Sequence, residues 1–193
     1  MLKHPFVFSN KREIYSFYDS FKDAPIKTIR AWIENVETLS QRFPDEDSCL
    51  KYKGDMLEVL SEIFFNCFSA DESVGLKDYT PVPLSEDYGV DAIGINPAGT
   101  RCAVQCKYKS FQPVLYEELA KTFTSALCTM NCDVLKENSI YVFTTAVEFT
   151  TAIEKQLGNK VRRIDLNVIS RKVDNNHTFW QYAYDIIFDT LDK

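Results

Sequence analysis

The sequence predicts an α/β fold in which helices cover both faces of a central mixed sheet, with a helical segment in front of it. Two β-like runs flank a strong turn signal, which indicates a β-hairpin. Helical and strand patterns then alternate, as is typical of a sheet with helices on both faces. The 193 residues are 45% apolar, which is enough for one core and favours one main domain.

Residues 1–50 are expected to form a helical accessory segment. Residues 11–21 and 25–43 look helical, the second of them because its apolar side chains recur at helical spacing. A proline and a run of charges at residues 43–48 then predict a loop or a weak domain boundary. The main domain is therefore expected over residues 51–193.

Residues 55–68 predict an amphipathic helix early in the main domain. Its apolar side chains share one face, while Asp55, Glu58 and Glu62 lie on the opposite, polar stripe. An acidic stripe of this kind is usually a solvated helix face. Residues 73–80 then weakly predict a strand.

The hairpin that follows is the most informative element, with strands predicted over residues 90–96 and 101–108. If its turn is symmetric, Asp91 lies opposite Gln105. Because side chains alternate across a strand, Lys107 shares their face and is a diagonal neighbour of Asp91. The pattern therefore brings an acid, an amide and an ammonium together.

The rest of the chain alternates between helix and strand patterns. Helices are predicted over residues 114–132, 147–157 and 178–191, and strands over residues 139–145 and 164–169.

The six cysteines are expected to be reduced thiols, because no secretory signal accompanies them. Cys102 and Cys106 share the second face of the hairpin with Val104, which indicates packing. Cys128 and Cys132 have a spacing that could place two thiolates on a metal, although we favour a core position on a helix for both.

The formal net charge of −6 does not favour DNA binding, because phosphate contacts need Lys or Arg. Basic residues are concentrated at Lys107 and Lys109 and again over residues 155–172, so one face could still bind a polyanion. Lys109 could meet a phosphate or simply be solvated. Without a signal peptide or a long apolar run, we expect a cytoplasmic protein with no membrane partner.

The residues gathered by the hairpin have a chemical rationale. Carboxylate and amide carbonyl oxygens suit a hard divalent cation such as Mg²⁺, so Asp91 and Gln105 are candidate metal ligands. The ammonium of Lys107 could orient or help deprotonate an attacking water, or stabilise negative charge developing at phosphorus. This combination favours metal-assisted hydrolysis of a phosphodiester.

Three motifs resemble those of the Mrr-like branch of the PD-(D/E)xK restriction-endonuclease superfamily. They are Gly54-Asp55-Met56-Leu57-Glu58, Tyr88-Gly89-Val90-Asp91 and Val104-Gln105-Cys106-Lys107, and a later strand that ends in threonines, Val142-Phe143-Thr144-Thr145, is also similar. The resemblance covers roughly residues 52–170. It implies a three-layer α/β/α restriction-endonuclease-like fold and a Mg²⁺-dependent deoxyribonuclease.

The resemblance also implies a role for each site residue. Asp91 would be the central metal ligand, Gln105 the second ligand from the strand and Lys107 the catalytic lysine. Glu58 would be the helix acid that approaches the metal directly or through water, with Glu62 as its rival on the same stripe. Mg²⁺ is the expected cofactor, and Mn²⁺ is expected to substitute for it.

Two alternatives to a self-contained endonuclease stay open at this point. The chain could be a non-catalytic module that binds DNA or docks a partner. It could also be the nuclease part of a larger restriction or recombination machine; because it has no phosphate-binding loop of the G-x-x-x-x-G-K-[ST] type, a helicase or motor partner would lie on another chain or beyond Lys193. Duplex DNA is the expected partner, and the resemblance implies a homodimer that cuts two strands.

Overall fold

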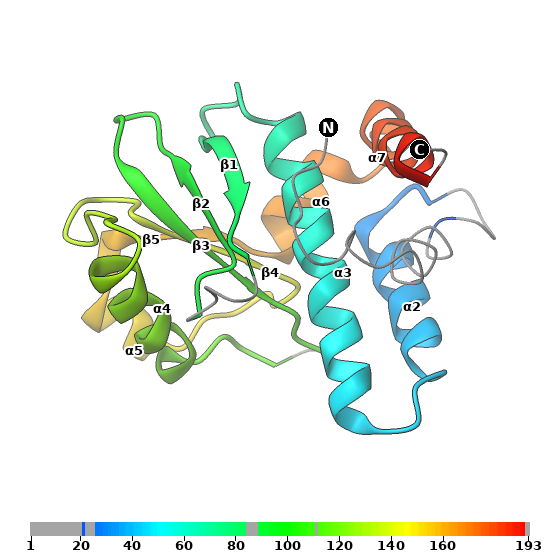
Figure 1. The fold of residues 1–193 in the computed structure, drawn as a ribbon, viewed down its shortest axis with the longest axis horizontal. Coiled ribbons are helices and arrows are strands. Elements are labelled where there is room, and N and C mark those ends of the chain that lie inside the picture. Colours follow the sequence, from blue (N-terminus) through cyan, green and yellow to red (C-terminus); the bar gives the residue numbers. More distant parts are fainter. Residues whose placement is uncertain (1–20, 22–25, 84–88, 111, 192–193) are drawn as a thin grey trace.

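The centre of the fold is a five-stranded mixed sheet in the order β1-β2-β3-β4-β5 (Figure 1). Our computed structural model describes residue 21 and residues 26–83, 89–110 and 112–191. Its strands are β1 (Lys77–Pro81), β2 (Ala92–Ile95), β3 (Arg101–Lys107), β4 (Ile140–Thr144) and β5 (Val161–Ile164). The first three strands pair antiparallel, and β3, β4 and β5 pair parallel. The predicted α/β class with a mixed sheet is thereby confirmed.

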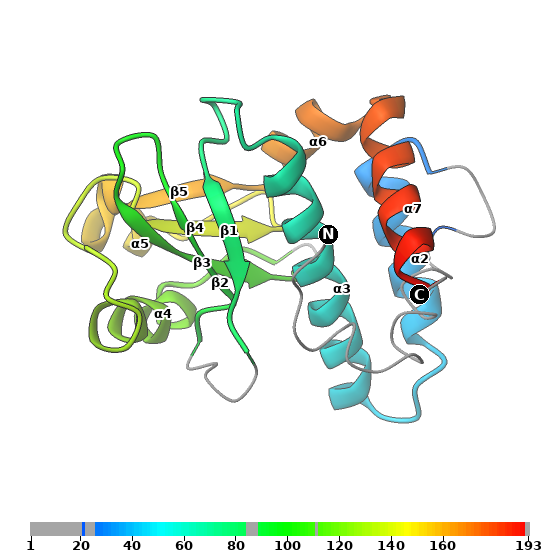
Figure 2. The same cartoon turned by 45° about the horizontal axis from the view of Figure 1, so that its top comes forward.

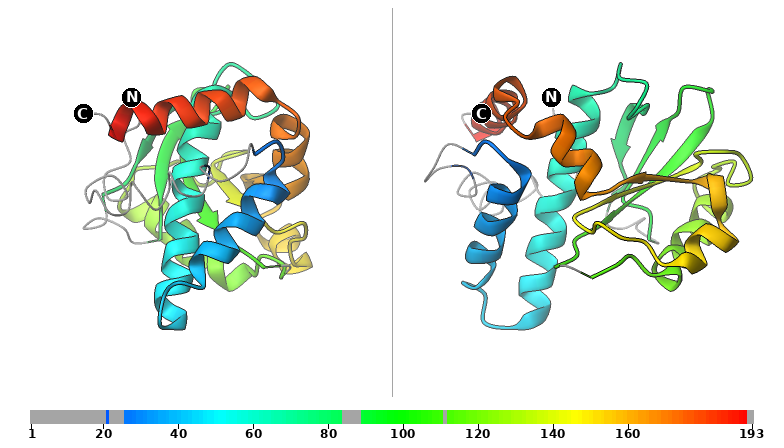
Figure 3. Two further views of the ribbon diagram at one scale, coloured as in Figure 1. Left: turned by 90° about the vertical axis from the view of Figure 1, so that its right-hand side faces the viewer. Right: turned by 180° about the vertical axis from the view of Figure 1, so that it is seen from behind.

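Helices cover both faces of this sheet. On one side are α2 (Ile29–Ser40), α3 (Glu46–Cys67), α6 (Leu166–Val173) and α7 (His177–Leu191). On the other are α4 (Tyr116–Cys128) and α5 (Thr151–Gln156), the latter followed by a short 3₁₀ turn. Figures 2 and 3 show that α3 lies against the sheet, with α2 and α7 on the side of α3 that faces away from it.

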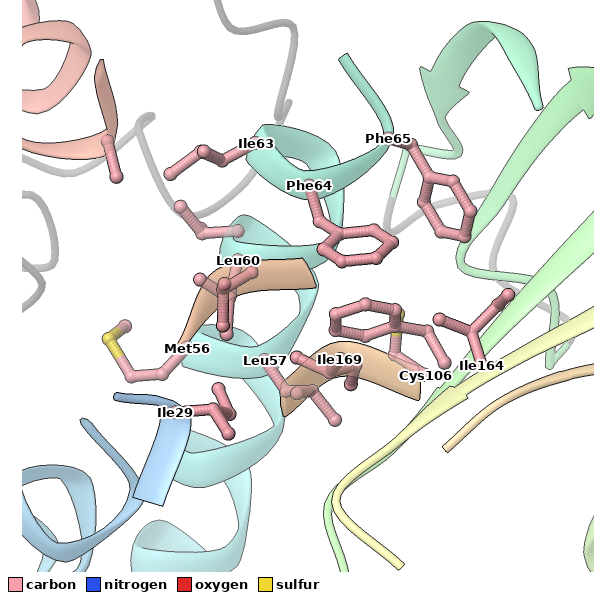
Figure 4. Close-up of a cluster of buried hydrophobic side chains, with 14 of the residues drawn as sticks. Ile29, Met56, Leu57, Leu60, Ile63, Phe64, Phe65, Cys106, Ile164 and Ile169 are labelled. Carbon is pink, nitrogen blue, oxygen red and sulfur yellow. The ribbon is translucent and has the colours of Figure 1, made fainter. Parts of the chain in front are cut away.

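The main core lies between α3 and the sheet. Phe64 packs on Phe143 of β4 with ring centroids 5.2 Å apart, and Phe65 stacks on Tyr79 of β1 at 5.4 Å. Figure 4 shows Phe64 and Phe65 of α3 on the side of the helix toward Cys106 of β3, while Met56 and Ile63 point to the opposite side. Burying large aromatic side chains contributes on the order of 2 kcal/mol each, so this interface holds α3 in a fixed position over the sheet.

Two helix boundaries on the N-terminal side differ from the prediction. The helix predicted over residues 25–43 is α2, whose first turn is capped by the side chain of Thr28; the helix predicted over residues 11–21 lies outside the described residues apart from Phe21. The loop or weak boundary predicted over residues 43–48 is present at residues 43–45 but ends earlier than predicted, because α3 begins at Glu46. There the carboxylate of Asp45 accepts a hydrogen bond from the backbone N–H of Ser48 at 2.8 Å and caps the helix. The prediction of an accessory segment over residues 1–50 stays a prediction, and α3 crosses its end.

The strand predicted over residues 164–169 is also wrong. The strand ends at Ile164, and Asp165 caps α6 by accepting a hydrogen bond from the N–H of Val168 at 2.9 Å. Ile169 and Val173, four residues apart, are the buried residues of α6, a helical spacing that the short apolar run concealed.

All six cysteines are free thiols, as predicted. The shared core position expected for Cys128 and Cys132 is wrong, because α4 ends at Cys128, which is exposed, and only Cys132 is buried. In the part of the chain that the structure describes, no helix combines the length and apolarity needed to cross a membrane.

Candidate active site

The β2–β3 hairpin has the register that the sequence predicts. Ala92 lies opposite Val104 and Ile95 opposite Arg101. The turn between the strands is closed by Asn96, whose side-chain oxygen accepts a hydrogen bond from the N–H of Thr100 at 2.9 Å. This symmetric turn aligns the start of β2 with the end of β3.

Asp91 and Gln105 meet at that end of the hairpin. Asp91 directly precedes β2, and its Oδ2 accepts hydrogen bonds from Nε2 of Gln105 and from the backbone N–H of Cys106, each at 2.5 Å. Both side chains are buried. The predicted juxtaposition of the acid and the amide is therefore present in the fold.

Thr122 of α4 is a third member of this buried group, and sequence reasoning missed it. Its hydroxyl donates a hydrogen bond to Oε1 of Gln105 at 2.5 Å, and its side chain is fully buried. A signal was present, because Thr122 and Ser125 lie on the same helix face as the apolar Leu119. A polar side chain on a buried helix face needs a hydrogen-bond partner in the core.

The orientation of the Gln105 amide decides how this group could hold a cation. Its N–H faces Asp91 and its carbonyl oxygen faces Thr122. For the carbonyl oxygen to join the Asp91 carboxylate as a metal ligand, the amide would have to be reversed. The hydroxyl of Thr122 can accept as well as donate, so it can pair with the amide in both orientations. The donor set thus fits a hard divalent cation in the reversed orientation.

Lys107 closes β3 and is half-buried. Among the described residues its ammonium forms no ion pair. Its backbone carbonyl accepts a hydrogen bond from the hydroxyl of Thr144 at 2.6 Å, and Thr145 bonds both backbone groups of Lys109 through its hydroxyl. The two threonines at the end of β4 therefore fix the backbone on either side of residue 108.

Glu37 of α2 holds the same segment from the other side, a contact that the sequence did not suggest. Its carboxylate accepts hydrogen bonds from the hydroxyls of Tyr108 at 3.0 Å and Ser110 at 2.8 Å, and it also pairs with Lys53. Carboxylate hydrogen bonds of this kind are stronger than neutral ones. The segment that follows Lys107 is thus clamped between α2 and β4.

Lys109, which we expected either to meet a phosphate or to be solvated, forms an ion pair instead. Its ammonium lies 2.5 Å from a carboxylate oxygen of Glu118 in α4, and the side chain is only 14% exposed. Lys107 is therefore the better candidate to act on a substrate.

Glu58 lies on α3, across the sheet from Thr122, and is half-buried. Its backbone carbonyl accepts a hydrogen bond from the hydroxyl of Ser61 at 2.7 Å, and Ser61 also bonds the hydroxyl of Tyr79 at 2.6 Å and the thiol of Cys106 at 3.2 Å. This buried chain of polar groups joins the backbone of Glu58 to β3.

The pKa of the Cys106 thiol on β3 is affected by Glu58 on α3 as well as by Asp91 and Lys107. Burial raises the pKa of the Cys106 thiol well above its usual value. The charges of Asp91 and Glu58 raise that pKa further, while Lys107 lowers it. The thiol is therefore neutral, and three of the four predicted site residues act on it from their separate elements.

Of the two other acids on the stripe of Glu58, Glu62 is not where a solvated helix face would place it. Glu62 is fully buried. Burial raises the pKa of Tyr79 on β1 and of Tyr182 on α7, and the nearby charge of Glu62 raises both pKa values further. Asp55 forms an ion pair with Lys51 at 2.5 Å. The expectation that the stripe is simply wet is wrong for Glu62, because neighbouring elements cover this part of α3.

Among the described residues, no group of three or more His, Cys, Asp and Glu side chains could hold a metal ion. A metal bound near Asp91 would therefore depend on the amide oxygen of Gln105. Comparisons of the chain with protein-family models, with curated proteins and with solved structures found no match. The function is accordingly argued from the motifs and from the contacts described above.

Proposed function

We propose that this protein is a metal-dependent DNA endonuclease of the Mrr-like branch of the PD-(D/E)xK superfamily, with a three-layer restriction-endonuclease-like fold. The observation that carries the proposal is the contact between Asp91 and Gln105 at the end of the hairpin. Lys107, two residues further along β3, shares their side of the strand.

Asp91 and the reversed amide of Gln105 would hold Mg²⁺, for which Mn²⁺ would substitute, and Glu58 would approach the cation from α3 directly or through water. When bound, the cation would lower the pKa of the attacking water and neutralise charge on the scissile phosphate. Two N–H donors already stabilise the ionised form of Asp91. An ionised carboxylate is the form that a metal ligand requires.

Lys107 is proposed to act directly on the attacking water and the scissile phosphate. Its ammonium would orient the attacking water and stabilise the negative charge that develops on the phosphoryl oxygens. The water oxygen forms a bond to phosphorus as the bond from phosphorus to the 3′ oxygen breaks. The proton lost by the water balances the one that the 3′ oxygen gains, which leaves 5′-phosphate and 3′-hydroxyl ends.

Plasmid cleavage tests this function directly. Purified protein is incubated with supercoiled plasmid and Mg²⁺, and nicked and linear forms are measured over time. We expect Asp91→Ala and Lys107→Ala to lose at least 100-fold of the rate, on the order of a lost charge-stabilising group. Lys51→Ala, which removes an exposed ammonium in the first turns of α3, should keep it. Cleavage that survives both site substitutions would refute the assignment.

A second candidate function is a non-catalytic module that binds DNA or docks a partner. The observation that favours it is that Asp91 Oδ2 is already bonded to two N–H groups, so that the carboxylate is stabilised without a metal. Calorimetry with Mn²⁺ separates the two candidates. A nuclease should bind Mn²⁺ in an Asp91-dependent way, whereas a non-catalytic module should show no such Mn²⁺ binding.

Assembly is a separate part of the proposal. Cutting both strands of duplex DNA calls for two active sites, so we propose a homodimer on DNA. If the chain belongs to a larger restriction or recombination machine, the helicase or motor is a separate partner. Sedimentation with and without duplex DNA tests the dimer.

A further inference from the structure

A basic groove lies along the edge of the sheet beside β5 and α6. It encloses about 570 Å³, and its basic lining consists of Arg162, Arg163, Arg171 and Lys172. β5 is the edge strand opposite β1 and is separated from β3 by β4 (Figure 2). None of the candidate active-site residues lines this groove, so it is a separate feature of the surface.

Two of its four cations are partly neutralised. Lys172 donates a hydrogen bond to the carboxylate of Asp71, and Arg163 forms an ion pair with Glu154 at 3.0 Å. Glu137 supplies the only carboxylate among the described lining residues. The cations of the groove therefore outnumber the acids that face them.

The other two cations, Arg162 and Arg171, form no ion pair with any described residue. Arg162 donates a hydrogen bond to the backbone carbonyl of Ser73, which holds its guanidinium in place. Arg171 is exposed, and its Nε donates to the carbonyl of Asn167 in its own helix at 3.2 Å. Each guanidinium has further N–H donors for a ligand.

The chemistry of the lining indicates what that ligand would be. A guanidinium presents donors in a fork that matches two phosphate oxygens. Apart from the cations, Glu137 and two valines, the described lining residues are serine and asparagine, with no aromatic ring on which a base could stack. A ligand here would be held through its phosphates, which carry no sequence information.

We propose that this groove binds the phosphodiester backbone of DNA without sequence preference, outside the candidate active site. The choice of DNA as the polyanion rests on the proposed function. The inference explains how a chain with a formal net charge of −6 can hold a polyanion, because four cations line this groove. Cations spread along a strand and a helix suit an extended backbone better than a single nucleotide.

The test is binding of a fluorescently labelled duplex followed by anisotropy, with EDTA present and over a series of salt concentrations. Arg171→Ala should weaken binding about tenfold and make the plot of log K against log salt about 0.9 shallower, as for one lost phosphate contact. Because Arg171 is exposed and its only hydrogen bond to a described residue lies within α6, folding should be unaffected.

Asp71→Asn supplies the opposite change. It removes the carboxylate that neutralises Lys172, so binding should become tighter and its salt dependence steeper. A gain of affinity is a result that a damaged fold does not give. Lys51→Ala is the matched control, since it removes one positive charge from the far end of α3 and should leave binding unchanged.

Several outcomes would overturn the inference. The wild-type protein could fail to bind the duplex, or Arg171→Ala and Lys51→Ala could weaken duplex binding equally. Asp71→Asn could also bind the duplex no more tightly than the wild type does. Unlabelled duplex, inorganic phosphate and a mononucleotide are also compared as competitors. If the small molecules compete as well per phosphate as the duplex does, the groove is a small-molecule site instead. The binding assay contains EDTA and measures no cleavage, so a failure of the nuclease proposal would leave this binding result intact.

Discussion

Replacing Thr122 by valine should destabilise the protein through Gln105. Valine has nearly the shape of threonine but no hydroxyl, so Oε1 of Gln105 would lose its donor inside the core. Turning the amide over would not relieve this loss. Its oxygen would then lie against Oδ2 of Asp91, which now accepts the amide N–H at 2.5 Å.

The expected cost is that of one buried acceptor left without a donor, about 1–3 kcal/mol of the free energy of unfolding. For a domain of this size each kcal/mol corresponds to about 2–4 °C in Tm. Urea denaturation and calorimetry of metal-free protein would measure both quantities.

A double-mutant cycle makes the reasoning specific. In a Gln105→Leu background no amide oxygen remains, so Thr122→Val should cost clearly less than it does in the wild type. If the valine substitution costs the same in both backgrounds, to within about 0.5 kcal/mol, the hydrogen bond does not contribute as described.

Three further predictions follow from other contacts. Gly94→Ala would place its Cβ 2.7 Å from side-chain atoms of the buried Leu76, so urea denaturation should show a loss of about 1–3 kcal/mol. Phe64→Ala, which leaves a cavity in the aromatic core between α3 and β4, should cost about 3–5 kcal/mol by the same assay. Hydrogen bonds, of which the one from Lys172 has the largest effect, lower the pKa of Asp71 from 3.8 to about 2. The ionised carboxylate therefore stabilises the fold fully above about pH 4, and this stabilisation is lost as the pH falls toward 2. Wild type and Asp71→Asn should therefore differ in stability at pH 7 and converge near pH 2, and a constant difference would contradict this.

The hairpin could be predicted from the sequence because its determinants are local. Alternation of side chains and a turn centred on residues 96–100 specify which residues face each other, and the contact between Asp91 and Gln105 follows from that register. The same alternation correctly assigned Cys102 and Cys106 to the packing face.

Helix ends and short apolar runs were harder to predict, because the same sequence pattern is compatible with two different structures. Asp45 and Ser48 are typical of a loop and equally of a capped helix start. At residues 164–169 the run is short enough for either a strand or a helix, and the cap at Asp165 decides in favour of a helix.

The rest of the candidate site could not be predicted because it depends on elements that meet only in the folded chain. Thr122 reaches Gln105 from α4, and Glu37 reaches Tyr108 from a helix 71 residues away. Glu62 lies on a polar stripe in the sequence, but tertiary packing buries it. No local periodicity contains such information.

The alternation of side chains along β3 places core residues and candidate site residues on opposite faces of one strand, which limits how the length of the hairpin turn can change. Cys102, Val104 and Cys106 face the main core, while Gln105 and Lys107 occupy the intervening positions. Inserting or deleting one residue in the turn would exchange the two sets, placing an ammonium under α3 and core side chains on the face that α4 covers. Changes of turn length should therefore be tolerated only in pairs of residues. A variant whose strand register shifts by one residue should lose both its fold and its candidate site.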